Sequence, residues 1–239
     1  MSRRDQLDEL FVRLQTLLAP GGEPAETDAG LSGLRAWQAE RLARTYADLR
    51  KDPQYAAAIE FFLRDLYGPQ DFSQRDRDLA RAWRHLRRAL PRVALEILAR
   101  AIELQVLTAE LDLAMAGVLA PGPVSAAGYA AAYRAVGRRT ARCRQIELIV
   151  GIGTDLRSIV RHAWLGRLLR AAHGPAHAAG FGALQDFLER GFAAFRAMSD
   201  TERFLQAIRD REMQFLNEMM PGTERPDAAA IAPQQRTHA

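Results

Sequence analysis

Apolar residues recur along most of this chain at the three- and four-residue spacing of an amphipathic helix. The clearest case opens the sequence, where apolar side chains fall on one helical face: Leu7, Leu10, Phe11, Leu14, Leu17 and Leu18. Ser2, followed by Asp5 three residues later, is typical of a capping box at the start of this helix. Residues 20–30 are rich in Pro, Gly and acidic residues and predict a loop.

The same pattern continues to about residue 220. It predicts helices over 31–50, 54–67, 73–90, 91–119, 125–150, 154–172, 183–197 and 200–220. Gly151 and Gly153 are expected to interrupt the chain between two of these helices, and residues 173–182 to form a turn. We therefore predict an all-α fold, an irregular single-domain helical bundle of about nine helices. Residues 1–30 are interpreted as an N-terminal helix and loop that form an arm, 31–220 as the bundle, and 221–239 as a disordered tail.

Composition agrees with this fold. Ala, Leu and Arg make up 105 of the 239 residues, whereas Val and Ile together supply 17, and this balance favours helices over strands. The single cysteine, Cys143, excludes an internal disulfide framework and a cysteine-based zinc cluster. No stretch approaches the roughly 18–20 apolar residues of a membrane span, and no apolar segment of a signal peptide follows the charged N-terminus. We expect a soluble cytoplasmic protein.

Basic residues exceed acidic ones, 33 to 29, and 32 of the 33 are arginines. This excess is a weak indication of an anionic partner. Four arginines share one face of the helix predicted over 73–90: Arg77, Arg81, Arg84 and Arg88. They either bind phosphates or form a solvated face, and we favour the solvated face because Asp76 and Asp78 lie beside them.

The helix predicted over 91–119 is apolar around most of its circumference, which is typical of a central, buried helix. It also carries two polar stripes, the first formed by Glu96, Arg100 and Glu103 and the second by Gln105, Thr108 and Asp112. Whichever stripe faces protein must find hydrogen bonds, because an unpaired buried polar group costs about 1–3 kcal/mol. Gln105 and Asp112 are therefore candidate binding residues.

Three further polar residues are candidates for acid–base chemistry or metal binding. Glu147 extends the apolar line of the helix predicted over 125–150, so we expect it in the core, where a carboxylate is paired, protonated or part of a site. Its candidate partners are Arg144, Arg157 and His162. Asp155 and His162 share one flank of the next helix. These residue types suit general acid–base catalysis or a carboxylate–imidazole metal site, but their spacing specifies neither.

His173 and His177 have the four-residue spacing of a helical ligand pair. Gly174 and Pro175 lie between them and are expected to break the helix that would align their rings. We therefore predict no metal site there, and no bound cofactor elsewhere. The apolar stripe between Phe181 and Met198 is interpreted as core or as the wall of an apolar ligand cavity.

Two segments resemble a group of uncharacterised bacterial proteins, the FFLEE-motif (FFLEELY) proteins. They are FFLRDLYGP at residues 61–69 and AGFGALQDFLERGF at residues 179–192, and the likeness covers most of residues 31–220. Arg64 and Asp65 stand where the motif has two glutamates, so a role that needs two carboxylates does not carry over. The resemblance implies a helical fold and no particular chemistry.

Two residues of this motif segment are candidate partner-binding residues. Phe61 lies opposite the apolar face of its own helix, so it is either covered by another helix or presented to a partner. Tyr67 precedes the Gly68-Pro69 stop and offers an amphipathic ring at the helix end.

The leading hypothesis is a non-enzymatic binding or interaction protein, for a partner protein or for a small apolar ligand held between helices. The alternative is a metal- or haem-dependent enzyme that uses Glu147, Asp155 and His162. Nucleic-acid binding through the arginine-rich helix is the third hypothesis, and the sequence leaves open whether the protein is a homodimer.

Overall fold

The structure is a computed structural model, and it describes residues 3–18, 25–66, 78–79, 81–82 and 92–221. These residues form an all-α domain without a β-strand in any described segment, as the sequence predicted. The elements are α1 (Arg3–Leu18), α2 (Ala25–Thr45), α3 (Ala47–Lys51), α4 (Ala56–Phe61), the π-helical turn η1 (Phe62–Leu66), α6 (Arg92–Ala116), α7 (Ala126–Val136), α8 (Arg139–Val160), α9 (Ala163–Ala178), α10 (Gly182–Ala197) and α11 (Thr201–Met219).

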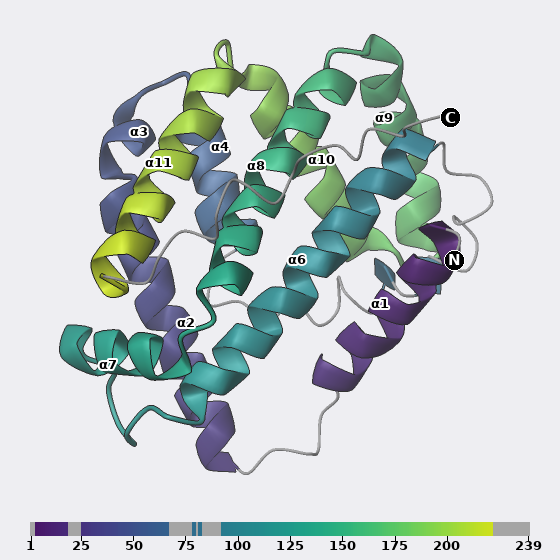
Figure 1. The fold of residues 1–239 in the computed structure, drawn as a ribbon. Coiled ribbons are helices and arrows are strands. Elements are labelled where there is room, and N and C mark those ends of the chain that lie inside the picture. The colour runs from purple at the N-terminus through teal and green to yellow at the C-terminus, as the bar shows by residue number, and fades with distance from the viewer. Residues whose placement is uncertain (1–2, 19–24, 67–77, 80, 83–91, 222–239) are drawn as a thin grey trace, which may run out of the picture.

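Helix α6 lies at the centre of the bundle, between α1 on one side and α8 on the other (Figure 1). The apolar stripe of α1 is buried on this helix, with Leu7, Phe11 and Leu14 packed against Leu95 and Ile102. The apolar stripe of the first helix is therefore covered by a helix of the same chain.

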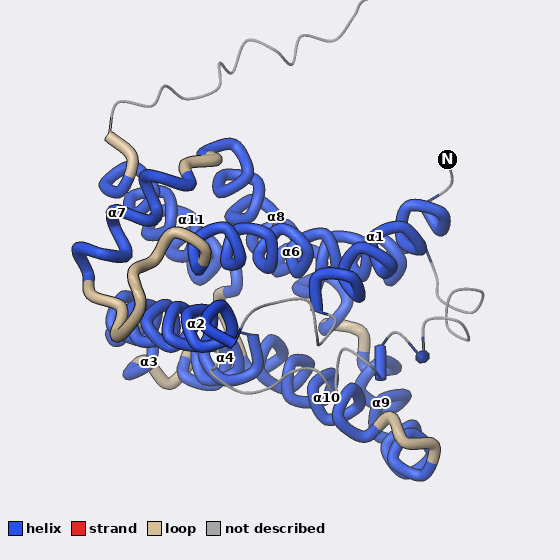
Figure 2. Tube along the Cα trace, turned by 90° about the horizontal axis from the view of Figure 1, so that it is seen from below, coloured by secondary structure: helices blue, strands red, loops and turns tan. Residues whose placement is uncertain are grey.

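Two further apolar clusters hold the remaining helices. One joins the end of α2, α4 and α11 around Tyr46, Tyr55 and Phe204. The other joins α2, α6, α7, α8 and α11, and there Trp37 stacks on Tyr129 with ring centroids 3.8 Å apart. Helices α9 and α10 form a hairpin at the opposite end of the molecule from α7 (Figure 2).

Several helix boundaries differ from the sequence prediction. Helix α2 begins at Ala25, inside the predicted loop, of which residues 20–24 lie outside the described part of the chain. The predicted helix over 125–150 is two helices, α7 and α8. They are separated by Gly137 and Arg138, which have φ angles of 63° and 54°. Both residues are therefore in the left-handed region, which a continuous α-helix excludes.

Two predicted breaks are absent. Helix α8 runs without interruption through Gly151 and Gly153, and at Gly153 an added Cβ would lie 2.4 Å from Cδ2 of Leu205. This glycine is thus a site of close packing against α11. Helix α9 continues through Gly174 and Pro175 to Ala178. Pro175 lies in the last turn and cannot donate a backbone hydrogen bond to the carbonyl oxygen of Ala171, yet three further residues complete the helix after it.

Candidate functional site

The three candidate acid–base residues do not form one group of side chains in the described structure. Glu147 is exposed and lies 3.8 Å from Arg144, one of its expected partners. Asp155 forms an ion pair with Arg100 of α6. His162 is exposed at the residue before α9, and its side chain forms no capping hydrogen bond. The described residues contain no metal-ligand group that joins these three side chains.

The expectation that Glu147 lies in the core is wrong, and the break between α7 and α8 is the reason. The predicted apolar line runs from α7 into α8 as if the two were one helix. Because Gly137 and Arg138 reset the direction of the chain, α8 buries a different face, which contains Arg142, Ile146 and Gly153. Glu147 lies one position round the helix from Ile146, on the side that faces solvent.

The polar stripe that contains Gln105 and Asp112 does find partners inside the protein. Asp112 is buried, and Nε2 of Gln38 donates a hydrogen bond of 3.0 Å to its Oδ1. Burial raises the pKa of the Asp112 carboxyl above its ordinary value, although Gln38 and Arg35 act in the opposite direction. Gln105 is half-buried. This stripe therefore joins α6 to α2 and is not open to a ligand at Asp112.

Phe61 is buried by another helix of the same chain. Its ring lies 5.3 Å from that of Phe187, centroid to centroid, and an added Cβ at Gly191 would lie 2.9 Å from its Cζ. It is 9% exposed, so its ring is not presented to a partner. Tyr67 lies outside the described residues. Of the arginine row, Arg81 is described: it pairs with Asp78 at 2.7 Å, whereas Arg77, Arg84 and Arg88 lie outside the described residues.

An open groove of about 660 Å³ lies between α9 and α10. Its floor is apolar and consists of Ala163, Gly166, Leu169, Phe192, Ala193 and Ala197. An added Cβ at Gly166 would lie 2.9 Å from two atoms of the Phe192 ring. The glycine therefore allows this ring to lie against the backbone of α9, and the two residues set the shape of the groove.

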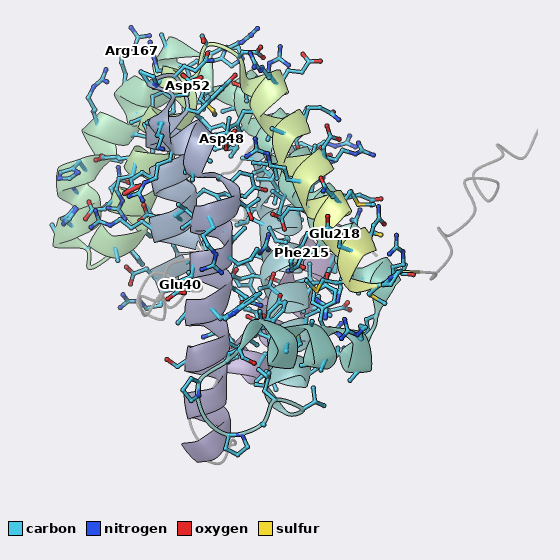
Figure 3. All side chains as sticks on the ribbon, turned by 90° about the vertical axis from the view of Figure 1, so that its left-hand side faces the viewer. Glu40, Asp48, Asp52, Arg167, Phe215 and Glu218 are labelled. Atoms are coloured by element: carbon cyan, nitrogen blue, oxygen red, sulfur yellow. The ribbon has the colours of Figure 1, made fainter. Side chains whose placement is uncertain are left out.

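Charged side chains line the rim of this groove. Arg167 and Arg170 come from α9, Arg196 comes from α10, and Glu189 is the acidic residue among them. All three arginines are exposed, and Arg167 lies at the upper edge of the molecule in Figure 3. None of the three forms an ion pair with a carboxylate within the part of the chain that the structure describes. The rim is thus a cationic surface above an apolar floor.

A second polar group lies on the same hairpin, near its turn. His173 and His177 come from α9, and Asp186 comes from α10. The predicted helix break between the two histidines is wrong, because α9 continues through Gly174 and Pro175 and so places both rings on one helical face. Their four-residue spacing was the signal that indicated this arrangement. The groove had a weaker signal, since Arg196 is distant in sequence from Arg167 and Arg170 and comes from another helix.

Comparison with known proteins identifies a family and no function. A family model described as "Domain of unknown function (DUF8198)" matches residues 18–226, and the chain belongs to this family. Neither the curated proteins nor the solved structures contain a match. No described helix has both the length and the apolar character needed to cross a membrane.

Proposed function

We propose that this protein is a non-enzymatic binding protein whose α9–α10 groove holds an acidic, amphipathic segment of a partner protein. The observation that carries the proposal is the combination of an apolar floor with three rim arginines that form no ion pair with a carboxylate of the described residues. A segment with apolar side chains on one face would cover the floor, and its carboxylates would pair with the rim.

The groove favours a protein segment over a small apolar ligand because it is open to solvent along its length. Ligand pockets for small molecules usually enclose most of the ligand surface.

Nucleic acid is a less suitable partner for this surface. Glu189 lines the groove, so the cationic rim is interrupted by a carboxylate. Phosphate backbones favour a continuous basic surface.

We further propose that the protein is cytoplasmic and that it belongs, more specifically, to the FFLEE-motif group.

The enzyme hypothesis that uses Glu147, Asp155 and His162 finds no support in the geometry. Asp155 is engaged by Arg100, and Glu147 and His162 are exposed with no shared ligand position among the described residues. General acid–base catalysis needs the acting groups within hydrogen-bond reach of one reacting atom.

The test uses the full-length protein and a fluorescein-labelled synthetic helix that carries Leu at three- and four-residue spacing and Glu at the flanking positions. Fluorescence anisotropy should show saturable binding at physiological salt. Replacing Arg167, Arg170 and Arg196 together with Gln should weaken binding about tenfold, at about 0.5 kcal/mol for each exposed ion pair. The same peptide with Lys in place of Glu should bind far more weakly.

A matched control has the same change of charge at three exposed arginines outside the groove, Arg134, Arg203 and Arg209. This variant should bind the Glu peptide as the unmodified protein does. Equal weakening in both triple variants, or equal binding of the Lys peptide, would overturn the proposal. Tighter binding of duplex DNA than of the peptide, lost in the groove variant, would assign the groove to nucleic acid instead.

A further inference from the structure

The polar group near the turn of the α9–α10 hairpin has the composition of a metal site. One ligand atom from each of His173, His177 and Asp186 lies within 4.8 Å of the others. The two imidazole rings lie side by side, with centroids 4.5 Å apart. Oδ1 of Asp186 is 2.8 Å from Nε2 of His177. Three potential ligands from two helices therefore converge on one region of space.

Two further side chains, Glu189 and Gln185, hold this group in place through hydrogen bonds. Nδ1 of His173 lies 3.1 Å and 3.2 Å from the two carboxylate oxygens of Glu189. Gln185, which is buried, donates from Nε2 both to Oε1 of Glu189 and to the carbonyl oxygen of Leu169, each at 2.8 Å. A carboxylate bound to one ring nitrogen fixes the orientation of a ligand histidine and leaves the other nitrogen for the metal.

A glycine makes room for the second histidine. At Gly182, the first residue of α10, an added Cβ would lie 2.7 Å from Nδ1 and 2.8 Å from Cε1 of His177. Any other residue at position 182 would push the imidazole ring away from its place beside Asp186. The position of His177 thus depends on a close approach between the two helices.

We propose that His173, His177 and Asp186 bind one divalent transition-metal ion, with Glu189 as the outer partner of His173. Two imidazoles and one carboxylate are a ligand set that Zn²⁺ accepts, with bonds of about 2.0–2.2 Å. Imidazole also suits Cu²⁺ and Ni²⁺, whereas Mg²⁺ and Ca²⁺ prefer oxygen ligands alone. The three side chains are exposed or half-buried, so they can close around the ion and leave further positions to water.

The proposal is independent of the groove. It rests on the histidines near the turn, and the groove rests on arginines nearer the other end of the hairpin. Glu189 is the one side chain that lies at both. Metal binding is tested with the ion alone and peptide binding with chelated protein, so the two proposals fail separately.

The experiment is isothermal titration of ZnCl₂ into full-length protein from which the affinity tag has been removed and bound metal has been stripped with a chelator. We expect one Zn²⁺ per chain. His173→Ala and His177→Ala should each weaken binding about 100-fold, and Asp186→Asn, which keeps the shape of the side chain, should weaken it at least about tenfold. Gly182→Ala should also weaken it about tenfold, although it removes no ligand.

His162→Ala is the matched control, because His162 is an exposed histidine at the start of the same helix and lies outside the ligand group. It should leave both stoichiometry and affinity unchanged. Circular dichroism of each variant confirms that it is folded before titration. The proposal is overturned if the unmodified protein takes up no Zn²⁺ at 100-fold excess, or if the His177 and Asp186 variants bind it as tightly as the His162 variant does.

Discussion

The ion pair between Arg41 and Glu212 joins α2 to α11 inside the bundle, and breaking it should strongly destabilise the fold. Nη1 of Arg41 donates to both carboxylate oxygens, at 2.7 Å and 2.8 Å. The hydroxyl of Tyr46 donates to Oε1 of the same carboxylate at 2.8 Å, and the guanidinium lies 4.3 Å from the centroid of the Phe215 ring. The side chains of the two charged residues are 15% and 13% exposed.

The perturbation is Glu212→Gln, which keeps an acceptor for Tyr46 and removes the charge opposite Arg41. Removing one partner of a fully buried pair costs about 3–5 kcal/mol. Because this pair retains a small exposure and the variant retains the Tyr46 hydrogen bond, we expect a loss of about 2–3 kcal/mol. Nε of Arg41 already lacks a hydrogen-bond partner among the described residues, so the guanidinium has little to replace the lost contact.

Urea unfolding followed by far-ultraviolet circular dichroism at pH 7 measures this loss, which should lower the midpoint by about 1 M at a slope of about 3 kcal/mol per M. Glu218→Gln is the control, because Glu218 is exposed on the same helix and should cost less than about 0.5 kcal/mol. A loss below about 1 kcal/mol for the Glu212 variant would refute the reasoning. If the loss is as large as expected, adding Arg41→Met to the Glu212→Gln variant should recover part of it, since the unpaired charge is gone.

Three further variants test other parts of the structure by the same unfolding assay. Phe11→Ala should cost about 3–4 kcal/mol, since the ring is buried between α1 and α6, and a negligible cost would show that α1 is loosely attached. Glu147→Gln should change the free energy of unfolding by less than about 0.5 kcal/mol, and a loss of several kcal/mol would contradict its exposed position. Burial raises the folded-state pKa of Asp112, so the stability that its protonated form contributes at low pH is lost as pH rises through that pKa. The stability of Asp112→Asn relative to the unmodified protein should therefore be higher at pH 7.5 than at pH 4. A difference that does not change with pH would count against the raised pKa.

Features that depend on one helix at a time were predictable from the sequence. The apolar stripe of α1 and the nearly continuous apolar surface of α6 gave their burial and central position correctly. The cap of α7 was also predictable, since Ser125 accepts a hydrogen bond of 3.1 Å from the backbone nitrogen of Gly128. These features rest on local periodicity and capping chemistry, which a single sequence contains.

Features that depend on contacts between distant residues were not predictable. Gly153 has a low helix propensity, yet α8 continues through it because packing against α11 outweighs that propensity; Leu205 of α11 fills the space that a side chain at position 153 would need. The break at Gly137 and Arg138 was missed for the opposite reason, because one glycine between apolar segments does not distinguish a helix end from a helix interior. As a result, Glu147 was predicted to lie in the core, whereas it lies on the surface.

The candidate site was harder to predict than the fold because it lies between two helices. The groove needs Gly166 on α9 and Phe192 on α10 in contact, and neither residue type indicates a groove by itself. The two histidines carried a usable signal in their spacing. Because proline usually ends a helix, the sequence predicted a break between the two histidines. The helix instead continues for three residues beyond Pro175.

The two segments that carry the resemblance to the FFLEE-motif proteins pack directly against each other. Phe61 lies against Phe187 and Gly191 of α10. Asp65 of η1 is buried and accepts hydrogen bonds at 3.0 Å and 2.7 Å from Nε and Nη2 of Arg190. These contacts fix α10 on the body of the bundle, while α9 is held mainly through α10. The motif residues therefore act by positioning, because both the arginine-rimmed groove and the histidine group require α10 to be held in place.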